Sequence, residues 1–352
     1  MEIIFKKENL GKFNEFWEMY LDNNPVTFRY TKIFIEYLLN YSNNITDDLS
    51  FVYIENNEPV AIVFLPIEEN NFKSISLSGS YTVAPLAKNK KYMKKVFNII
   101  DELSKINNIK LIKFYIDPQY QKFLNLEYNF LLEYGFINTS SSTCIIDLRK
   151  SQQDIWSKIR KANKSLINGI IKNSAYEIIV YDYQNPDFAV HELYRELHKK
   201  CAGKETRRKI TFDLQYQMLI DDKAALFSLK FKESYIAFAY FLHFQKSCIY
   251  MSAADDPDFE SLNISKSHPL IWTACLYYKK RGIELLELSQ PCGFSKVSGL
   301  DDYLDEKQIN ISHFKRGIGG EMVLMYRGIK YFDKNLLICD IEKFKERVTS
   351  IF

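Results

Sequence analysis

The chain has 352 residues, of which 47% are hydrophobic and 26% are charged, with only 12 glycines and 9 prolines. This composition excludes disordered, collagen-like and low-complexity proteins, and the length predicts two domains of ~100–200 residues each. Basic residues number 47 and acidic residues 44. A net charge of +3 over this length argues against a binder of duplex DNA, so a nucleic-acid partner would need a local basic patch.

Six cysteines are scattered without a CxxC pair or a histidine at zinc-ligand spacing. The sequence therefore indicates neither a disulfide framework nor a metal site. The opening residues MEIIFKKENL lack the apolar core of a signal peptide, and apolar stretches such as residues 60–66 are far shorter than the ~20 residues that span a membrane. We therefore expect a cytoplasmic protein without a transmembrane segment.

The first half reads as two helices, a hairpin, a third helix and a strand. Residues 13–20 and 31–41 have helical periodicity, and residues 50–67 form two β-branched and aromatic runs around a polar turn at 56–59. Apolar residues at helical spacing follow between 93 and 103, and residues 109–117 read as a strand. This order predicts a mixed α/β unit.

The middle of the chain, residues 147–178, predicts one long helix that links two domains, because its apolar residues recur at helical spacing. Its basic residues are typical of a solvated helix face, with a phosphate-binding surface as the alternative. Beyond it, helices are expected at 191–200 and 212–220, and a hairpin at 225–244. A further helix around residue 270 leads into a strand at 283–290.

The two halves repeat each other in element order. Ala61 and Ala237, at equivalent points of the two hairpins, are 176 residues apart, and the following helices and strands are offset by 177 and 174 residues. Such self-similarity predicts a structural duplication, although chance recurrence of common units is the alternative. We expect domains at 1–147 and 148–352, each with a mixed, mostly antiparallel sheet flanked by helices.

The segment 310–332, NISHFKRGIGGEMVLMYRGIKYF, resembles the FKxxFG element of the FemABX-type peptidyl and acyl transferases, which consist of two tandem GNAT-like domains. KIRKANKSLINGIIKN, at 158–173, is similar to the interdomain helix start of that family. Residues 197–219 and 268–290 look like their counterparts in its second domain. The resemblance covers residues 150–320, and it implies a cytoplasmic transferase that attaches an acyl or aminoacyl group to an amine of a cell-wall precursor or glycan sugar.

The sequence departs from the family pattern in three places. No helical insertion of ~50 residues is visible in the second half, and Ile318 stands where the family has its next aromatic residue. The glycine-rich pyrophosphate loop of coenzyme A-dependent GNAT enzymes is missing at 83–93 and at 262–272. Without those glycines, backbone N–H groups close less readily on a phosphate, which argues against ordinary acetyl-CoA use.

Three residues are candidates for catalysis. Lys315, in the matched element, would stabilise the oxyanion of an acyl-transfer intermediate, since a fixed cation in a water-poor site interacts strongly with developing charge. His268 precedes Pro269 at a helix start and is a candidate base, although such histidines more often pack or cap. Glu287, on a strand, is a candidate proton acceptor or amine-orienting group, with a rim charge as the alternative.

Eight further residues are candidates for donor or substrate binding. In the matched element, Phe314 would pack against the acyl or adenosine end of the donor, next to Arg316. The alternative is that Lys315 and Arg316 are surface cations that cap a hairpin. A basic loop after the expected helix end at Gly203 suits a sugar-nucleotide pyrophosphate, although it reads equally well as a solvated loop. Its polar residues are His198, Lys204, Arg207 and Arg208. The resemblance implies that Arg29 and Lys32 lie in the stretch of the first domain that contacts the nucleotide precursor.

The function expected from this reading is an N-acyl- or aminoacyltransferase of cell-envelope or glycan biosynthesis, acting on a nucleotide- or lipid-linked amino sugar or a peptidoglycan precursor. The donor, aminoacyl-tRNA or an acyl-CoA, would be a co-substrate, with no tightly bound cofactor and no metal. One alternative is an acyl-CoA-dependent N-acetyltransferase of capsule or flagellar sugar biosynthesis. Another is a catalytically inactive protein that binds glycan or tRNA.

Overall fold

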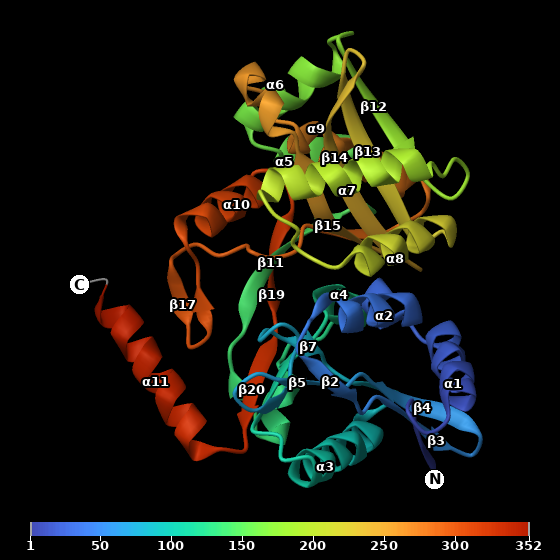
Figure 1. Cartoon of the computed structure of the whole chain (residues 1–352), viewed down its shortest axis with the longest axis vertical. Coiled ribbons are helices and arrows are strands. Elements are labelled where there is room, and N and C mark those ends of the chain that lie inside the picture. Colours follow the sequence, from blue (N-terminus) through green and yellow to red (C-terminus); the bar gives the residue numbers. More distant parts are fainter. Residues whose placement is uncertain (1, 351–352) are drawn as a thin grey trace. The chain divides into compact units, whose positions relative to one another are not determined.

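The computed structural model describes residues 2–350 and divides into two compact units (Figure 1). Unit 1 comprises Met1–Ser141, Ser295–Asp305 and Leu324–Phe352, and unit 2 comprises Ser142–Phe294 and Glu306–Val323. This division differs from two domains at 1–147 and 148–352. The reason is that the chain returns to unit 1 after Val323, where its last strand enters a sheet built from the first half.

Unit 1 carries two larger sheets and a two-stranded ribbon. Its elements in chain order are β1 (Glu2–Phe5), α1 (Leu10–Asn23), η1 (Phe28–Tyr30), α2 (Lys32–Tyr41), β2 (Ile45–Asp48), β3 (Phe51–Glu55), β4 (Glu58–Val63), β5 (Pro66–Glu69), β6 (Lys73–Ile75), β7 (Thr82–Val83), β8 (Leu86–Ala87), α3 (Lys90–Ile106), β9 (Leu111–Tyr115), α4 (Pro118–Leu124), η2 (Phe130–Tyr134), β10 (Ile137–Asn138), β17 (Val297–Gly299), β18 (Asp302–Tyr303), β20 (Arg327–Tyr331) and α11 (Lys334–Thr349). The strand orders are β1-β3-β4-β8 and β10-β20-β9-β6-β5-β2, with β7 paired to β9 and a separate β17-β18 ribbon.

The expected hairpin of the first half is confirmed as β3 and β4. Its turn is made by Asn56 and Asn57, both at positive φ, as a two-residue hairpin loop requires. The expected helix is α3, and Phe97 on its apolar face meets Phe114 of β9 edge to face. The 3.6-residue spacing in the sequence therefore correctly predicted which face of α3 packs against the sheet.

Unit 2 is organised around one seven-stranded sheet. Its elements are β11 (Ser141–Asp147), α5 (Gln152–Lys158), α6 (Lys161–Ile171), β12 (Tyr176–Tyr181), α7 (Phe188–Ala202), α8 (Lys209–Ile220), β13 (Ala224–Phe231), β14 (Ser234–Phe244), β15 (Ser247–Asp255), η3 (Pro257–Leu262), α9 (Ser267–Lys280), β16 (Leu285–Glu287), α10 (Glu306–Arg316) and β19 (Glu321–Met325). The strand order is β12-β13-β14-β15-β16-β11-β19. From β12 to β15 and between β16 and β11 the strands pair antiparallel, whereas β15 and β16 pair in parallel.

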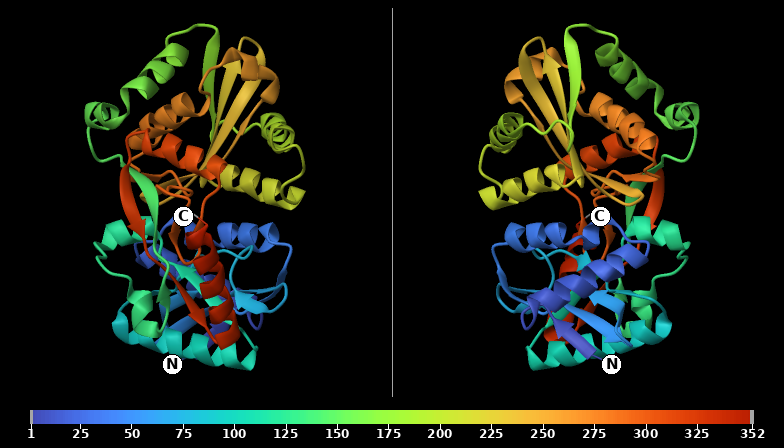
Figure 2. Two further views of the ribbon diagram at one scale, coloured as in Figure 1. Left: turned by 90° about the vertical axis from the view of Figure 1, so that its left-hand side faces the viewer. Right: turned by 90° about the vertical axis from the view of Figure 1, so that its right-hand side faces the viewer.

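Helices cover both faces of this sheet. On β14, Tyr240 contacts Tyr194 of α7, while its neighbour Phe241 contacts Tyr278 of α9. Successive strand residues point to opposite faces, so α7 and α9 lie on opposite sides of the sheet, as Figure 2 shows. The predicted order of hairpin, helix and strand therefore recurs in both units, as β3-β4, α3, β9 and as β13-β14, α9, β16.

The prediction of a single long helix at 147–178 is wrong. Residues 152–171 form two helices, α5 and α6, because Ile159 and Arg160 have extended backbones. The break is held by Gly317, whose carbonyl oxygen accepts from the Arg160 N–H at 3.1 Å and from Asn163 Nδ2 at 2.9 Å. A Cβ on Gly317 would lie 2.5 Å from that nitrogen, so any larger residue would displace the Asn163 side chain from this contact.

Helix α7 ends as the sequence predicts. Gly203 has φ of 68° and forms its left-handed C-cap. None of the helices within residues 2–350 combines the length and apolar character that crossing a bilayer requires.

Glu68 on β5 is a fully buried carboxylate with a full set of donors. Ser42 Oγ donates to it at 2.6 Å, Ser76 Oγ at 2.7 Å and the Gly79 N–H at 2.9 Å, and the Ser78 N–H also donates to it. Burial opposes ionisation of this carboxyl, but these hydrogen bonds outweigh burial and lower its pKa. The ionised side chain therefore fixes the 76–79 turn to β5.

Replacing Glu68 by Gln should destabilise the protein by about 2 kcal/mol, because an amide cannot accept from every one of these donors. Urea denaturation at pH 7 measures the loss. Glu69→Gln is the control, since Glu69 is exposed and its side chain has no hydrogen bond among the described residues. Equal stability of the two variants would contradict the role assigned to Glu68.

Candidate active site

The sheet of unit 2 opens where β15 and β16 separate. The two strands pair in parallel over only three residues, from Ser247 with Leu285 to Ile249 with Glu287. Beyond this point β15 continues to Asp255 alongside β14 alone, while the chain after β16 turns away at Ser289, which has φ of 63°. The two strands thus diverge like the arms of a V.

A cavity of about 500 Å³ lies in this opening, and we call it the Lys315 pocket. Its walls come from the free arm of β15, the start of α9, the loop after β16 and the end of α10. The lining residues are Tyr250–Ala253, Asp255, 264–267, 289–291, Ile311, Phe314 and Lys315. A β-bulge lies on its wall: Tyr240 pairs with Ser252 but Phe241 pairs with Tyr250, which leaves Met251 without a cross-strand partner.

The N-terminus of α9 opens into the pocket. Ser265, Lys266 and Ser267, which precede and begin this 14-residue helix, line the cavity. The unpaired N–H groups of a helix start, together with the helix dipole, favour a negatively charged group. Lys266 is buried, and its Nζ donates to the carbonyl oxygen of Asp256 at 2.8 Å, which ties the 256–266 loop to the helix start.

Lys315 is a buried lysine on the cavity wall. Its Nζ donates to the carbonyl oxygens of Ser289 at 3.2 Å and Gln290 at 2.8 Å. A lysine ammonium has three hydrogens, so one remains for a ligand. Only 5% of the residue is exposed, and burial lowers its pKa to about 8 although nearby Cys292, Glu287 and Cys144 raise it. At pH 7 the side chain is therefore mostly a cation, held at the last turn of α10.

Glu287 supplies the compensating negative charge. It is 1% exposed and accepts from Thr143 Oγ1 at 2.9 Å, so the alternative of a rim charge is wrong. After the coulombic effect of Cys292, which is hydrogen-bonded to Cys144, the Glu287 carboxylate is the next cause that raises the pKa of Lys315. Glu287 lies behind the pocket wall, where it keeps Lys315 charged.

Phe314 and His268 form an aromatic pair beside Lys315. Their ring centroids are 4.6 Å apart, edge to face, and Phe314 lines the cavity. His268 is buried, its Nδ1 is hydrogen-bonded to Ser265 Oγ, and burial lowers its pKa to about 4. A neutral imidazole held in this way positions Phe314 and the start of α9, and this geometry favours packing over the expected role as a base.

Arg316 binds the same loop as Lys315. Its guanidinium donates to the carbonyl oxygen of Gly293 and lies 4.4 Å from the ring centroid of Phe294. Both cations of the motif therefore hold the chain that follows β16. The surface cap on a hairpin is wrong for Lys315, which is buried at the end of a helix.

Asp255 is a pocket residue that sequence reasoning missed. It is the last residue of β15, its Oδ1 is buried, and among residues 2–350 that atom has no hydrogen-bond partner. Burial raises its pKa, with Lys266 opposing the shift. The only hint of Asp255 in the sequence is a pair of aspartates, Asp255 and Asp256, after a stretch with strand character. Such a pair is equally typical of an ordinary strand end.

The basic loop after α7 is not gathered at the pocket. Lys204 and Arg208 are exposed. Arg207 is buried, donates to Tyr194 Oη at 3.0 Å and Gln215 Oε1 at 2.6 Å, and lies 4.0 Å from the ring centroid of Phe212.

His198 packs beside Arg207, between the rings of Tyr194 and Phe212. Burial and, to a smaller extent, the positive charge of Arg207 lower its pKa to about 4. The cluster still reaches the cavity indirectly, because Tyr194 Oη is 2.6 Å from Oγ of Ser252, a lining residue. Arg207 and His198 therefore support the pocket wall. Of the basic loop expected to bind a pyrophosphate or to be solvated, only Lys204 and Arg208 are exposed.

Arg29 and Lys32 belong to unit 1. Arg29 is buried and pairs with Asp117 at 3.0 Å, where Thr27 Oγ1 also donates. Lys32 is only partly buried, with 38% of its side chain exposed, and pairs with Glu18 at 3.1 Å. Arg29 therefore acts as a packing residue that fixes the start of α4, and only Lys32 is accessible to a substrate.

The comparisons with known proteins support the fold. No family model matches the sequence, and no curated protein is similar enough to be matched to it. Among solved structures, FemX aligns with a TM-score of 0.61 at 13% identity over 96% of this chain and 98% of FemX. A conserved protein of unknown function from Bacteroides thetaiotaomicron VPI-5482 gives 0.60 at 12% identity over 94% of this chain and 100% of that chain.

A third structure is the C-terminal domain of a putative lysylphosphatidylglycerol synthetase from Agrobacterium fabrum. It gives a TM-score of 0.52 at 10% identity over 84% of this chain and 91% of that chain. The expected fold class is confirmed: the chain has a FemX-like α/β fold with mixed, mostly antiparallel sheets flanked by helices. Within residues 2–350, no cluster of His, Cys, Asp or Glu is placed to hold a metal ion.

The lowered pKa of Lys315 makes its effect on stability depend on pH. Between pH 8 and 10.5 the unfolded chain binds a proton that the folded chain does not, so the free energy of unfolding rises with pH in this window. Relative to Lys315→Met, the wild type should gain about 3 kcal/mol between pH 7.5 and 10.5. Urea denaturation at both pH values measures this difference.

Lys307→Met is the control for this measurement, because Lys307 is an exposed lysine on the same helix. Its stability relative to the wild type should not change between the two pH values. A pH-independent difference for Lys315→Met would show that Lys315 titrates normally in the folded protein.

Proposed function

We propose that the chain is an N-acyl- or aminoacyltransferase of cell-envelope synthesis, and that the reaction takes place in the Lys315 pocket. The observation that carries this proposal is a buried, mostly protonated lysine on the wall of a 500 Å³ cavity, between the free arm of β15 and the N-terminus of α9. The FemX-like α/β fold agrees with it.

Amide formation in this pocket would proceed by direct attack. The nitrogen of a neutral acceptor amine attacks the acyl carbon, a C–N bond forms, and the carbonyl oxygen becomes an oxyanion. The third hydrogen of Lys315 is available to that oxygen, and a preorganised cation in a partly dry site stabilises it strongly. Collapse of the intermediate breaks the C–O bond of an ester donor or the C–S bond of a thioester.

Asp255 is the proton acceptor in this proposal. The attacking nitrogen loses one proton, which moves to the Oδ1 atom that has no other partner among the described residues. The raised pKa of this carboxyl makes it a stronger base than an exposed aspartate. The same proton can then pass to the departing oxygen or sulfur, so the carboxylate is regenerated.

Aminoacyl-tRNA is the donor that we favour. Residues 256–266, between β15 and α9, contain no glycine, so the loop lacks the freedom to wrap its backbone around a pyrophosphate. The similarity to FemX and to a putative lysylphosphatidylglycerol synthetase domain accords with transfer of an aminoacyl group to an envelope component. The acceptor would be the amino group of a nucleotide- or lipid-linked sugar or peptide precursor.

An acyl-CoA donor is the second candidate, because the start of α9 faces the pocket and favours a phosphate group. The decisive experiment offers purified protein UDP-linked amino sugars and peptidoglycan precursors with either charged tRNA or acyl-CoA. Mass spectrometry then detects the added acyl group. Binding of donor and acceptor without any product would identify an inactive glycan- or tRNA-binding protein and overturn the proposal.

Lys315→Met should lower kcat/KM by about 10²–10³-fold, as expected when one donor to an oxyanion is lost. The exposed lysine on the same helix provides the matched control, so Lys307→Met should retain full activity. Steady-state kinetics with the identified donor test this. Unchanged turnover in Lys315→Met would remove Lys315 from the reaction.

Asp255→Asn should remove an acid limb from the pH profile. In the wild type, kcat/KM should fall as the pH drops through the pKa of Asp255, which lies above the ordinary carboxyl value of 3.8, because the protonated acid accepts no proton. The variant should be slower by about 10²–10⁴-fold and lack this limb. A limb that persists in Asp255→Asn would assign it to another group.

A further inference from the structure

Helix α11 of unit 1 covers a polar cavity. No side chain of this 16-residue helix is buried, yet Asp340, Lys343 and Arg347 follow each other at three- and four-residue spacing and so share one face. All three line a cavity of about 250 Å³ whose other side is formed by β6, β9 and the 70–79 segment. A helix normally turns apolar residues toward a sheet, so a charged inner face needs another explanation.

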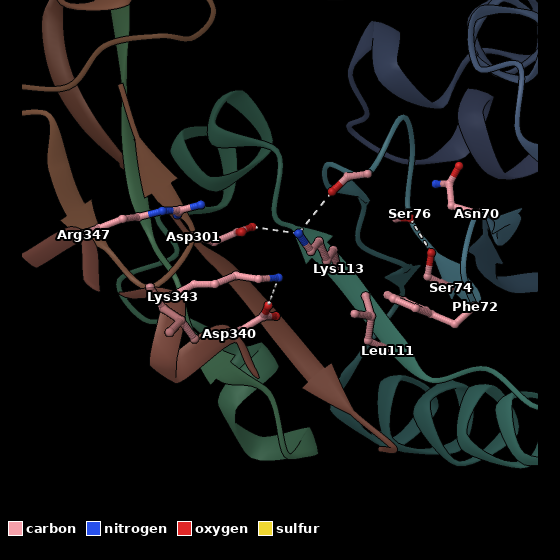
Figure 3. Close-up of a pocket in the computed structure, with 12 residues that line it drawn as sticks. Asn70, Phe72, Ser74, Ser76, Leu111, Lys113, Asp301, Asp340, Lys343 and Arg347 are labelled. Carbon is pink, nitrogen blue, oxygen red and sulfur yellow. Dashed lines mark hydrogen bonds and ion pairs between the residues drawn. The ribbon is translucent and has the colours of Figure 1, made fainter. Parts of the chain in front are cut away.

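The charges in this cavity are unevenly paired. Lys113 of β9 pairs with Asp301 at 3.0 Å, and Lys343 pairs with Asp340 at 3.4 Å. Arg347 lies 5.5 Å from the ring centroid of Tyr303 and has no carboxylate partner among residues 2–350. Three cations therefore face two carboxylates. Figure 3 shows Asp340, Lys343 and Arg347 on α11, and Lys113 on β9 pointing toward Asp301.

The opposite side offers an apolar wall and a directed hydroxyl. Phe72 and Leu111 provide the wall. Ser76 Oγ donates its hydrogen to the ionised Glu68 at 2.7 Å, so in the 2.8 Å contact between Ser74 and Ser76 the donor must be Ser74. The Ser74 oxygen then has only acceptor capacity left for a ligand, which must itself donate there.

We propose that this cavity, the α11 pocket, binds a small hydroxylated oxyanion such as a sugar phosphate or a hydroxy acid. The anionic oxygens would meet the forked guanidinium of Arg347 and the ammonium of Lys113. A hydroxyl would donate to Ser74, and the carbon skeleton would lie against Phe72 and Leu111. The site is independent of the Lys315 pocket, since all its lining residues belong to unit 1.

The size of the cavity limits the ligand. Sites for drug-sized molecules measure about 300–1,000 Å³, so 250 Å³ suits a single ring with one anionic group. Such a ligand would bridge α11 to β9 and add contacts to a helix that has no buried side chain of its own. Binding should therefore slow amide hydrogen exchange within α11, which is a readout that does not depend on any catalytic activity.

Calorimetric titration of the full chain with four compounds tests the proposal. Glucose 1-phosphate and gluconate carry a hydroxylated skeleton with a phosphate and a carboxylate respectively, glucose lacks the anion, and inorganic phosphate lacks the skeleton. We expect at least one of the two hydroxylated anions to bind at least tenfold more tightly than glucose and inorganic phosphate. The stronger of the two identifies the anionic group.

Variants locate the binding. Arg347→Gln should weaken the hydroxylated anion at least tenfold, and Ser74→Ala should weaken it while leaving inorganic phosphate unchanged. Lys345→Gln is the control, because Lys345 lies on the exposed face of α11 and pairs with Glu342. Equal binding by Arg347→Gln and wild type, equal affinity for glucose and the anions, or no binding at 20 mM would each overturn the proposal.

Discussion

The short parallel pairing between β15 and β16 is the constraint on which the candidate active site depends. Hydrogen bonding ends after Ile249 and Glu287, and every wall of the Lys315 pocket lies beyond this point. A longer ladder would close the cavity. Polar contacts then hold the chain after β16 away from β15. Lys315 donates to two carbonyl groups of this loop, and Arg316 donates to a third.

The buried cations among the candidate residues show two ways in which the protein accommodates positive charge. Arg29 and Arg207 are held by partners from their own surroundings, a carboxylate in one case and a phenol, an amide and an aromatic ring in the other. Lys315 has carbonyl partners and a carboxylate nearby, which compensate it only in part, so its pKa stays low. Incomplete compensation leaves a cation with capacity for a ligand, and burial alone does not distinguish these cases.

Local patterns predicted most elements of the fold. The Asn56–Asn57 turn, the apolar face of α3 and the glycine end of α7 each depend on neighbours within one or two turns of chain. The break between α5 and α6 was missed because it depends on Gly317, more than 150 residues away. A helical pattern contains no record of a distant carbonyl that competes for its backbone N–H groups.

The candidate site was predicted only in part, for the same reason. Phe314, Lys315 and Arg316 came from a contiguous motif, and they lie together. Asp255 was missed because its unpaired oxygen is a property of the folded cavity. Arg207 was selected as a pyrophosphate-binding residue of a basic loop, but its inward position is fixed by Tyr194 and Gln215, which share no motif with it.

The discontinuous course of unit 1 has a consequence for how the protein is made. Strand β20, from the end of the chain, lies between β9 and β10, which are synthesised about 200 residues earlier. Until β20 leaves the ribosome, β9 and β10 expose unpaired backbone groups, which are open to pairing with other chains. Unit 2 is almost complete by then, so it is expected to fold first although its sequence begins second.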